Sequence, residues 1–170
     1  MNIFCKIALL GILLYLFHGC QLMQQEENPY CTSGKLTIEV TGKKYNWYYR
    51  FAGLDQTLHT EDDIISKNEI HVPTYTSIEL VFKSEDYLYF FKIPELEQAQ
   101  IAVPDLTHVL NFQTYSSMSY TIKGDQLCGF SHTSLFGELV VEKPSKFILW
   151  LQNIASQKID IHNEQETFYN

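Results

Sequence analysis

Apolar and polar residues alternate along much of this chain from residue 33 onward, with the two-residue period of a β-strand that buries one face. The segments KLTIEVTG (35–42) and SIELVFK (77–83) show the alternation most clearly. Their inward-facing residues are predicted to be Leu36, Ile38, Val40, Ile78, Leu80 and Phe82. Further short segments, most of them closed by Pro or Gly, are EIHVP (69–73), FFKIP (90–94), AQIAVP (99–104), HVLNFQT (108–114), MSYTIKG (118–124) and GELVVEKP (137–144). Short strands at this frequency predict an all-β protein, either a two-sheet sandwich or a barrel.

Near the C-terminus the pattern changes from the period of a strand to that of a helix. In KPSKFILWLQNIASQK (143–158), large apolar residues recur at helix-like spacing, and Pro144 suits the first turn of a helix. These apolar residues are Phe147, Leu149, Trp150, Leu151 and Ile154. We therefore expect a short C-terminal helix that packs on the sandwich by this stripe. Residues 153–170 are assigned to a polar C-terminal tail.

The start of the chain carries an almost unbroken apolar run, Ile7–Phe17. As a helix it rises only about 16 Å, short of the ~30 Å of a bilayer core, so residues 1–20 are interpreted as a signal peptide. Gly19 before Cys20 resembles a bacterial lipoprotein cleavage box, and lipidation of Cys20 stands beside a plain signal peptide and an uncleaved anchor as open alternatives. The polar residues 21–32 are expected to form a tether. The sequence thus predicts an exported protein held at the periplasmic face of a membrane.

Composition fits one folded domain behind this leader. With 170 residues, 45% of them hydrophobic, the chain can bury one core but not two, and we place the domain at 33–152. The net charge of −8 and the absence of clustered Lys and Arg exclude nucleic-acid binding as an expected function. No Ser-His-Asp spacing, glycine-rich phosphate loop or carboxylate pair stands out. We therefore expect the protein to have no catalytic activity of its own.

The cysteines leave one structural question open. If the leader is removed and Cys20 carries lipid, Cys31 and Cys128 are the remaining thiols. An oxidising compartment permits a disulfide between them, but their number alone does not predict one.

Five short motifs follow one another in order between residues 36 and 152. They are TGKKYNW (41–47), HVP (71–73), SEDYLYFFKIP (84–94), AVPD (102–105) and GDQLCGFSHTSL (124–135). In order and spacing they resemble the soluble copper domain of cytochrome c oxidase subunit II. The resemblance implies a cupredoxin, a Greek-key β-sandwich whose copper loop lies at one end between the last two strands, in the family of haem-copper terminal oxidases.

The same resemblance predicts a degenerate metal site. The family's binuclear copper A centre uses two bridging thiolates, two histidines, a methionine and a glutamate carbonyl, and this chain keeps only Cys128 and His132 of that set. The lost positions, in the order first histidine, first cysteine, glutamate and methionine, are Tyr89, Gly124, Gln126 and Leu135. We therefore expect no cofactor.

The partner implied by the resemblance is subunit I of a terminal oxidase or another membrane respiratory complex. Tyr45 stands where the family has an electron-accepting tryptophan, and Trp47 keeps the second aromatic position, so both are candidates for partner docking. The favoured function is a non-catalytic structural or docking subunit.

Two other metal hypotheses stay open. A single copper could use Cys128 and His132 with His71 or His108 as a distant ligand, which would make the protein an electron-transfer or copper-carrier cupredoxin. The favoured alternative is that Cys128 is a small buried apolar residue and His132 a loop histidine hydrogen-bonded to the backbone. His59 beside the acidic residues 61–63 could attract a hard cation, although such a charge run is usually a solvated turn.

Overall fold

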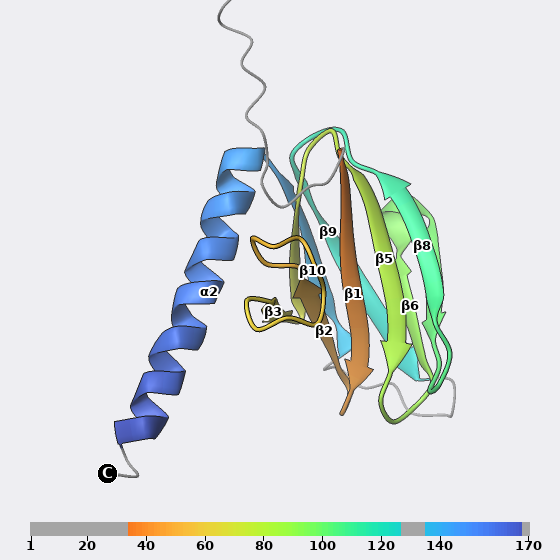
Figure 1. The fold of residues 1–170 in the computed structure, drawn as a ribbon. Helices are drawn as coiled ribbons and strands as arrows, with labels where there is room; N and C mark the ends of the chain where they lie inside the picture. Colours follow the sequence, from red (N-terminus) through yellow and green to blue (C-terminus); the bar gives the residue numbers. More distant parts are fainter. Residues whose placement is uncertain (1–33, 127–134, 168–170) are drawn as a thin grey trace, which may run out of the picture.

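Two five-stranded sheets packed face to face form the domain, with one long helix along their side (Figure 1). A computed structural model describes residues 34–126 and 135–167. The strands are β1 (Lys35–Lys43), β2 (Asn46–Phe51), β3 (Ile64–Lys67), β4 (Glu69–Pro73), β5 (Ser77–Ser84), β6 (Tyr89–Ile93), β7 (Gln98–Ala102), β8 (His108–Gln113), β9 (Met118–Gln126) and β10 (Gly137–Glu142). The helices are η2 (Pro94–Leu96) and α2 (Pro144–Thr167). The first sheet has the order β3-β2-β1-β5-β8 and the second β4-β10-β9-β6-β7.

The alternation in the sequence accounts for the centre of the first sheet. β1 and β5 pair in parallel, and their register sets Leu36 opposite Ile78, with the next two apolar positions of each strand following in step. All six residues of the two predicted stripes are 3% exposed or less. Because successive side chains of a strand point to opposite faces, the polar residues between them face outward. The predicted strands are confirmed, each within a residue or two of its expected bounds.

Two strands of the first sheet were not among the predicted segments. β2 is the aromatic stretch NWYYRF, in which Trp47, Tyr49 and Phe51 face inward at 0% exposure. β3 is only four residues long, too short to display a convincing alternation.

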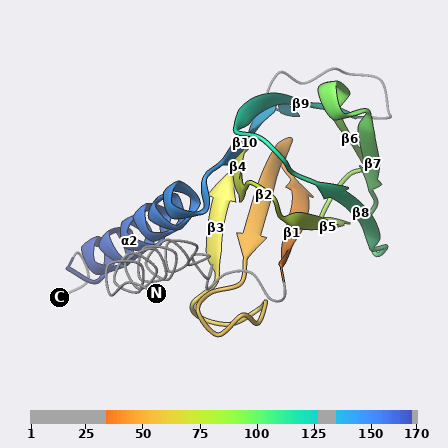
Figure 2. The ribbon, with the colours of Figure 1, turned by 90° about the horizontal axis from the view of Figure 1, so that it is seen from above.

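Helix α2 closes one open side of the sandwich. It packs on β3 and β4, the edge strands of the two sheets, whereas β7 and β8 meet on the opposite side (Figure 2). Phe147 and Leu151 are fully buried and Trp150 meets Phe51 edge to face, with ring centroids 5.6 Å apart. Leu149, expected in the same stripe, is 59% exposed, because it lies on the opposite side of the helix from Phe147 and Leu151.

The C-terminal helix is longer than the sequence pattern indicated. It continues to Thr167 and so takes in most of the residues assigned to a polar tail. No Gly or Pro follows Pro144 in this segment, so nothing in the backbone chemistry stops the helix. Across the described ranges, no helix combines the length and hydropathy needed to cross a bilayer. The apolar run at residues 7–17, Cys20 and Cys31 fall outside those ranges.

The sandwich has two ends, a loop end and a turn end. At the loop end, β9 ends at Gln126 opposite Tyr89, and the β1–β2 turn (44–45) lies beside the β5–β6 turn (85–88). At the turn end, Gly34 leads into β1 beside the β4–β5 turn (74–76) and the β8–β9 turn (114–117).

Candidate functional site

Trp47 lies at the centre of the loop end and is fully buried. Its indole N–H donates a hydrogen bond to the carbonyl oxygen of Leu135 at 3.2 Å. Its ring meets Tyr89 and Phe91 edge to face, at centroid distances of 5.7 and 5.3 Å. Trp47 therefore ties the two sheets together from inside, and it offers no surface to a partner.

Tyr89 opens β6 and occupies the position that the motif comparison gives to the first histidine. Its side chain is buried, and its hydroxyl donates to Oδ1 of Asp86 at 2.6 Å while accepting the backbone N–H of Tyr45 at 3.2 Å. Burial and the hydrogen bond to Asp86 raise the pKa of the Tyr89 hydroxyl well above its ordinary value. In the absence of a metal the phenol stays protonated at neutral pH, and its hydroxyl is already engaged by Asp86 and by the backbone of Tyr45.

Asp86 holds the β1–β2 and β5–β6 turns together. Its partial burial opposes ionisation, but hydrogen bonds from Tyr89 and from the backbone N–H groups of Lys44 and Tyr87 outweigh that effect, so the pKa of Asp86 lies below its ordinary value. Asp86 is therefore a charged acceptor within the protein.

Gly124, at the position of the first cysteine, has no room for a side chain. A Cβ atom there would lie 2.6 Å from the carbonyl oxygen of Leu135 and 2.9 Å from Nε1 of Trp47. Leu135, at the methionine position, is fully buried in the core. Gly42 plays a related part on β1, where a Cβ would come within 2.3 Å of the Tyr89 ring. These glycines let Trp47 and Tyr89 fill the space.

A pair of tyrosines forms the outer face of the loop end. Tyr45 and Tyr87 stack with ring centroids 5.4 Å apart and planes 15° from parallel. Tyr87 is 46% exposed. Tyr45 adopts a left-handed φ of 59°, which is unusual for a residue other than glycine and turns its ring toward Tyr87 and Tyr89. Of the two predicted docking residues, Tyr45 is thus the one near the surface, and sequence reasoning missed Tyr87.

The remaining predicted ligands are not brought together in the described residues. Cys128 and His132 lie in 127–134, outside those residues, and Gln126 ends β9 with its backbone opposite Tyr89. In the described ranges, no group of three or more His, Cys, Asp and Glu side chains is placed to hold a metal ion.

The two candidate distant histidines differ in their surroundings. His71 lies under α2, stacked on Trp150 at 4.2 Å, with its ring nitrogens 2.6 Å from carboxylate oxygens of Glu69 and Glu142. It is therefore committed to the packing of the helix. His108 begins β8 opposite Phe82, and its Nε2 is buried with no hydrogen-bond partner within the described part of the chain.

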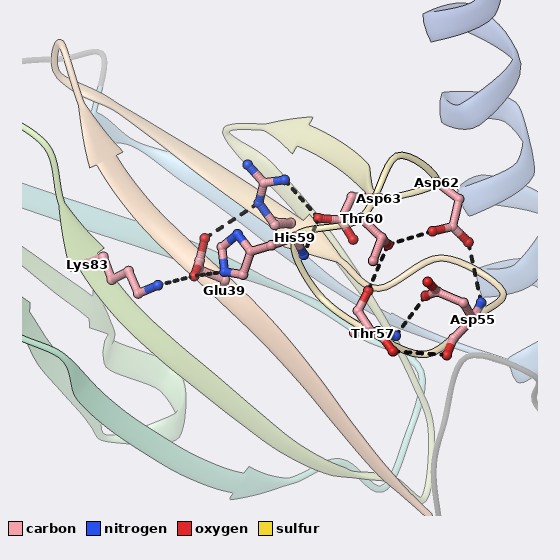
Figure 3. Close-up of polar contacts among 9 residues, drawn as sticks. Glu39, Asp55, Thr57, His59, Thr60, Asp62, Asp63 and Lys83 are labelled. Carbon is pink, nitrogen blue, oxygen red and sulfur yellow. Dashed lines mark hydrogen bonds and ion pairs between the residues drawn. The ribbon is translucent and has the colours of Figure 1, made fainter.

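Two of the three acidic residues that follow His59 are held by contacts within the β2–β3 loop and with Arg50 (Figure 3). Asp63 Oδ2 accepts hydrogen bonds from Arg50 and from the backbone N–H of His59, each at 2.8 Å. Asp62 accepts the Thr60 hydroxyl at 2.7 Å, which lowers the pKa of its carboxyl group. These contacts fasten the β2–β3 loop and leave little coordination capacity for a hard cation.

Glu39 anchors that loop to the outer face of the first sheet. Its buried carboxylate lies 2.5 Å from Nζ of Lys83 and 3.1 Å from Nε2 of His59, and Arg50 stands beside it in register on β2. Nothing in the sequence singled out Glu39, because it occupies one of the polar positions of the alternating strand β1.

No family model matches the chain, but curated relatives do. It is 22% identical over 137 residues to the alternative cytochrome c oxidase subunit 2 of Bradyrhizobium diazoefficiens, covering 68% of this chain and 50% of the relative. It is 24% identical over 115 residues to the cytochrome c oxidase subunit 2 of Thermostichus vulcanus, covering 68% and 32%. The chain thus matches half or less of these relatives' length.

Solved structures agree on the fold. The crystal structure of the periplasmic domain of subunit II of cytochrome oxidase from Bradyrhizobium japonicum superposes with a TM-score of 0.61 at 18% identity, covering 71% of this chain and 94% of that domain. A mixed disulfide intermediate between a thioredoxin-like protein and a subunit II domain of cytochrome c oxidase gives 0.59 at 19% identity, covering 71% and 92%. The fold is a cupredoxin-like Greek-key β-sandwich. Within that class, the domain resembles the cupredoxin domain of cytochrome c oxidase subunit II, as its motifs predicted.

Proposed function

We propose that this protein is a subunit II-like cupredoxin module that lacks a copper A centre and serves as a non-catalytic docking subunit of a haem-copper terminal oxidase or a related respiratory complex. Its relatives are named as oxidase subunits, and the similar solved domain is periplasmic, which supports a place at the periplasmic face of the membrane. The observation that carries the proposal is that Leu135 and Trp47 fill the space around Gly124, which supports the absence of a copper A centre.

The residues that occupy the ligand positions support the proposed loss of copper A. Two copper ions held by two thiolates need a cysteine at Gly124, where even a Cβ atom collides with the Leu135 backbone. Tyr89 presents a protonated hydroxyl already bonded to Asp86, and the side chain of Leu135 has no lone pair. Three of the ligand positions are therefore occupied by packed residues, and a copper centre could form only if these residues moved.

The docking role rests on the surface of the loop end. Tyr45 and Tyr87 present a stacked, partly exposed aromatic pair, a residue type enriched where proteins meet. Asp86 fixes the turns that carry both rings, so the pair is held rigid before a partner arrives.

A copper titration of the full chain tests the loss of the metal centre. We expect no thiolate-to-copper absorption band after addition of Cu(I) or Cu(II), and a spectrum equal to that of the Cys128→Ser variant. A stoichiometric band that disappears in Cys128→Ser would instead support the mononuclear copper carrier.

Docking is tested by solubilising membranes of cells that make the tagged full chain and recording the haem difference spectrum of the captured material. Haem-copper oxidase spectra should accompany the parent chain and decrease in Tyr87→Glu. Leu54→Glu, at a 70% exposed position in the β2–β3 loop, is the matched control and should capture as much as the parent. Equal capture by both variants would reject the loop end as the docking surface.

A further inference from the structure

Strand β8 is the last strand of the first sheet, where it pairs with β5 on one side (Figure 1). Just past the strand, the Thr114 N–H donates to the Thr76 carbonyl at 3.1 Å, so the even-numbered residues of β8 direct their backbone groups toward β5. The Val109 carbonyl points the other way, where it accepts a hydrogen bond from Nε2 of Gln100 at 3.0 Å. The odd-numbered residues of β8 therefore direct their N–H and C=O groups away from β5, and within the described part of the chain no strand pairs with β8 on that side.

This edge lacks the features by which proteins usually protect an exposed strand, namely Lys, Pro, a bulge or a covering helix. Helix α2 covers β3 and β4, the edge strands on the other side of the sandwich. The sequence of β8, HVLNFQ, contains no Lys, Arg, Asp, Glu, Pro or Gly, and its six residues keep an unbroken register with β5. β7 approaches β8 through the side chain of Gln100 but forms no ladder with it. The outer edge of β8 is therefore able to accept a further strand.

The side chains of β8 are complementary to those of a second copy of the same strand. Antiparallel pairing about a two-fold axis at Asn111 sets Val109 of one copy opposite Gln113 of the other. The same register sets Leu110 opposite Phe112, and outward-facing backbone groups then meet outward-facing groups, as an antiparallel ladder requires. Val109 is 45% exposed, and Leu110 and Phe112 are only partly buried against the core. Each copy therefore has apolar surface that the other can cover.

The nearest charge on β5 is neutralised within its own chain. Glu79 pairs with Asn111 across the sheet, and its carboxylate is held by Nζ of Lys35 at 2.8 Å and by the Thr37 hydroxyl at 3.2 Å. On the axis itself, two Asn111 amides each offer a donor and an acceptor, so they can hydrogen-bond to each other. The pairing thus brings no like charges together along the strand.

We propose that β8 is a homodimer interface, at which two copies of this chain pair their β8 strands antiparallel about Asn111 and join their first sheets into one continuous sheet. The interface is isologous, with backbone hydrogen bonds supplying affinity and the apolar pairs fixing the register. Because a single ladder buries a small area, we expect a dissociation constant of roughly 10–100 μM. Tyr45 and Tyr87 lie outside β8, so the dimer leaves the loop-end pair accessible. This inference does not depend on the metal content or on the partner of the domain.

Sedimentation equilibrium of the full chain in detergent solution measures the association. We expect the protein mass to rise from that of a monomer to that of a dimer as the concentration increases through this range. Asn111→Lys sets two like charges opposite each other on the axis and should raise the dissociation constant about fivefold. Leu54→Lys, at a 70% exposed position in the β2–β3 loop, is the matched control and should dimerise as the parent does.

Disulfide formation tests the register, in a full chain whose native cysteines are replaced by serine. In the proposed register the two Cα atoms at position 111 lie about 5.5 Å apart, within reach of a disulfide, whereas those at position 113 lie about 14 Å apart. With diamide as the oxidant, Asn111→Cys should therefore form a cross-linked dimer several-fold more readily than Gln113→Cys.

Three results would overturn the proposal: a monomer at every concentration, a dimer indifferent to Asn111→Lys, or equal cross-linking at positions 111 and 113. A monomeric chain whose capture of haem-copper oxidase is lost in Asn111→Lys would assign the edge to a strand of another protein. That outcome would also overturn the second copy as the occupant.

Discussion

The two ends of the sandwich use aromatic residues in opposite ways. At the loop end, Trp47 and Tyr89 are fully buried, and their polar atoms are hydrogen-bonded to Leu135 and Asp86. At the turn end, Tyr75 and Tyr115 are mostly exposed on turns held by hydrogen bonds between their threonine neighbours. The loop end buries two aromatic rings beneath the stacked pair of Tyr45 and Tyr87, whereas the turn end leaves both of its tyrosine rings exposed.

The difference shows that residues of a motif can be required for packing, independently of the metal chemistry with which the motif is associated in the family. Gly42 and Trp47 belong to the same motif, and here both are required for packing, because Gly42 makes room for the ring of Tyr89. A sequence that keeps such residues keeps the shape of a subunit II-like domain. It need not keep the metal that the shape accommodates in relatives.

The largest expected loss of stability comes from truncating a buried ring at the loop end. Trp47→Ala should lower the free energy of unfolding by about 3–5 kcal/mol, since it removes a fully buried ring and the Leu135 hydrogen bond. Tyr75→Ala at the turn end should change it by less than about 0.5 kcal/mol. Urea unfolding of both variants measures the contrast, and similar losses would contradict it.

Refilling the first cysteine position should also destabilise the protein. Gly124→Cys is expected to cost about 1–3 kcal/mol, because its Cβ atom meets the Leu135 carbonyl and Trp47. Gly124→Ala is the matched variant and should cost nearly as much, since the collision lies at Cβ rather than at sulfur. A stable Gly124→Cys protein that binds copper would show that the space is not filled.

The turns of the loop end should respond to pH through Asp86. Its pKa is depressed in the folded state, so its stabilising contribution is present above the unfolded value of about 3.9 and is lost as the pH falls through the lower folded value. Asp86→Asn should therefore lower the free energy of unfolding near neutral pH by at most about 1 kcal/mol, since solvent screens this exposed carboxylate, and should match the parent in strong acid. A difference that persists unchanged into acid would mean that charge is not the cause.

The smallest effect on folding is expected at the turn end, where the ring of Tyr75 is 78% exposed. Tyr75→Ser should leave the free energy of unfolding within about 0.5 kcal/mol of the parent. Urea unfolding measures this change, and a loss larger than about 1 kcal/mol would show that the exposed ring contributes to the fold.

Much of this architecture could be predicted from residue order, because alternation reports directly which side of a strand is buried. That argument placed Leu36 and Phe82 correctly, and the motifs predicted the fold. It missed β3, whose four residues carry too little periodicity, and it assigned Trp47 to a docking surface although an inward position on β2 buries it. The stacking of Tyr87 on Tyr45 depends on a left-handed turn that no period reveals.

The positions of the candidate site could be predicted from the sequence, but the space left between their side chains could not. Substitutions at Tyr89, Gly124 and Leu135 could be recognised from the motifs. That these residues close the space, with the Leu135 carbonyl 2.6 Å from a Cβ at Gly124, depends on how β9 and the start of β10 approach each other. Contacts between segments distant in sequence, such as Trp47 with Leu135, decide that approach.

The most direct test of the central claim is the copper content of the purified full chain after incubation with excess copper and exhaustive dialysis, measured by elemental analysis. A packed interior in place of the copper A ligands predicts well under one copper per chain, with no change on Cys128→Ser. Two coppers per chain retained through dialysis would contradict it.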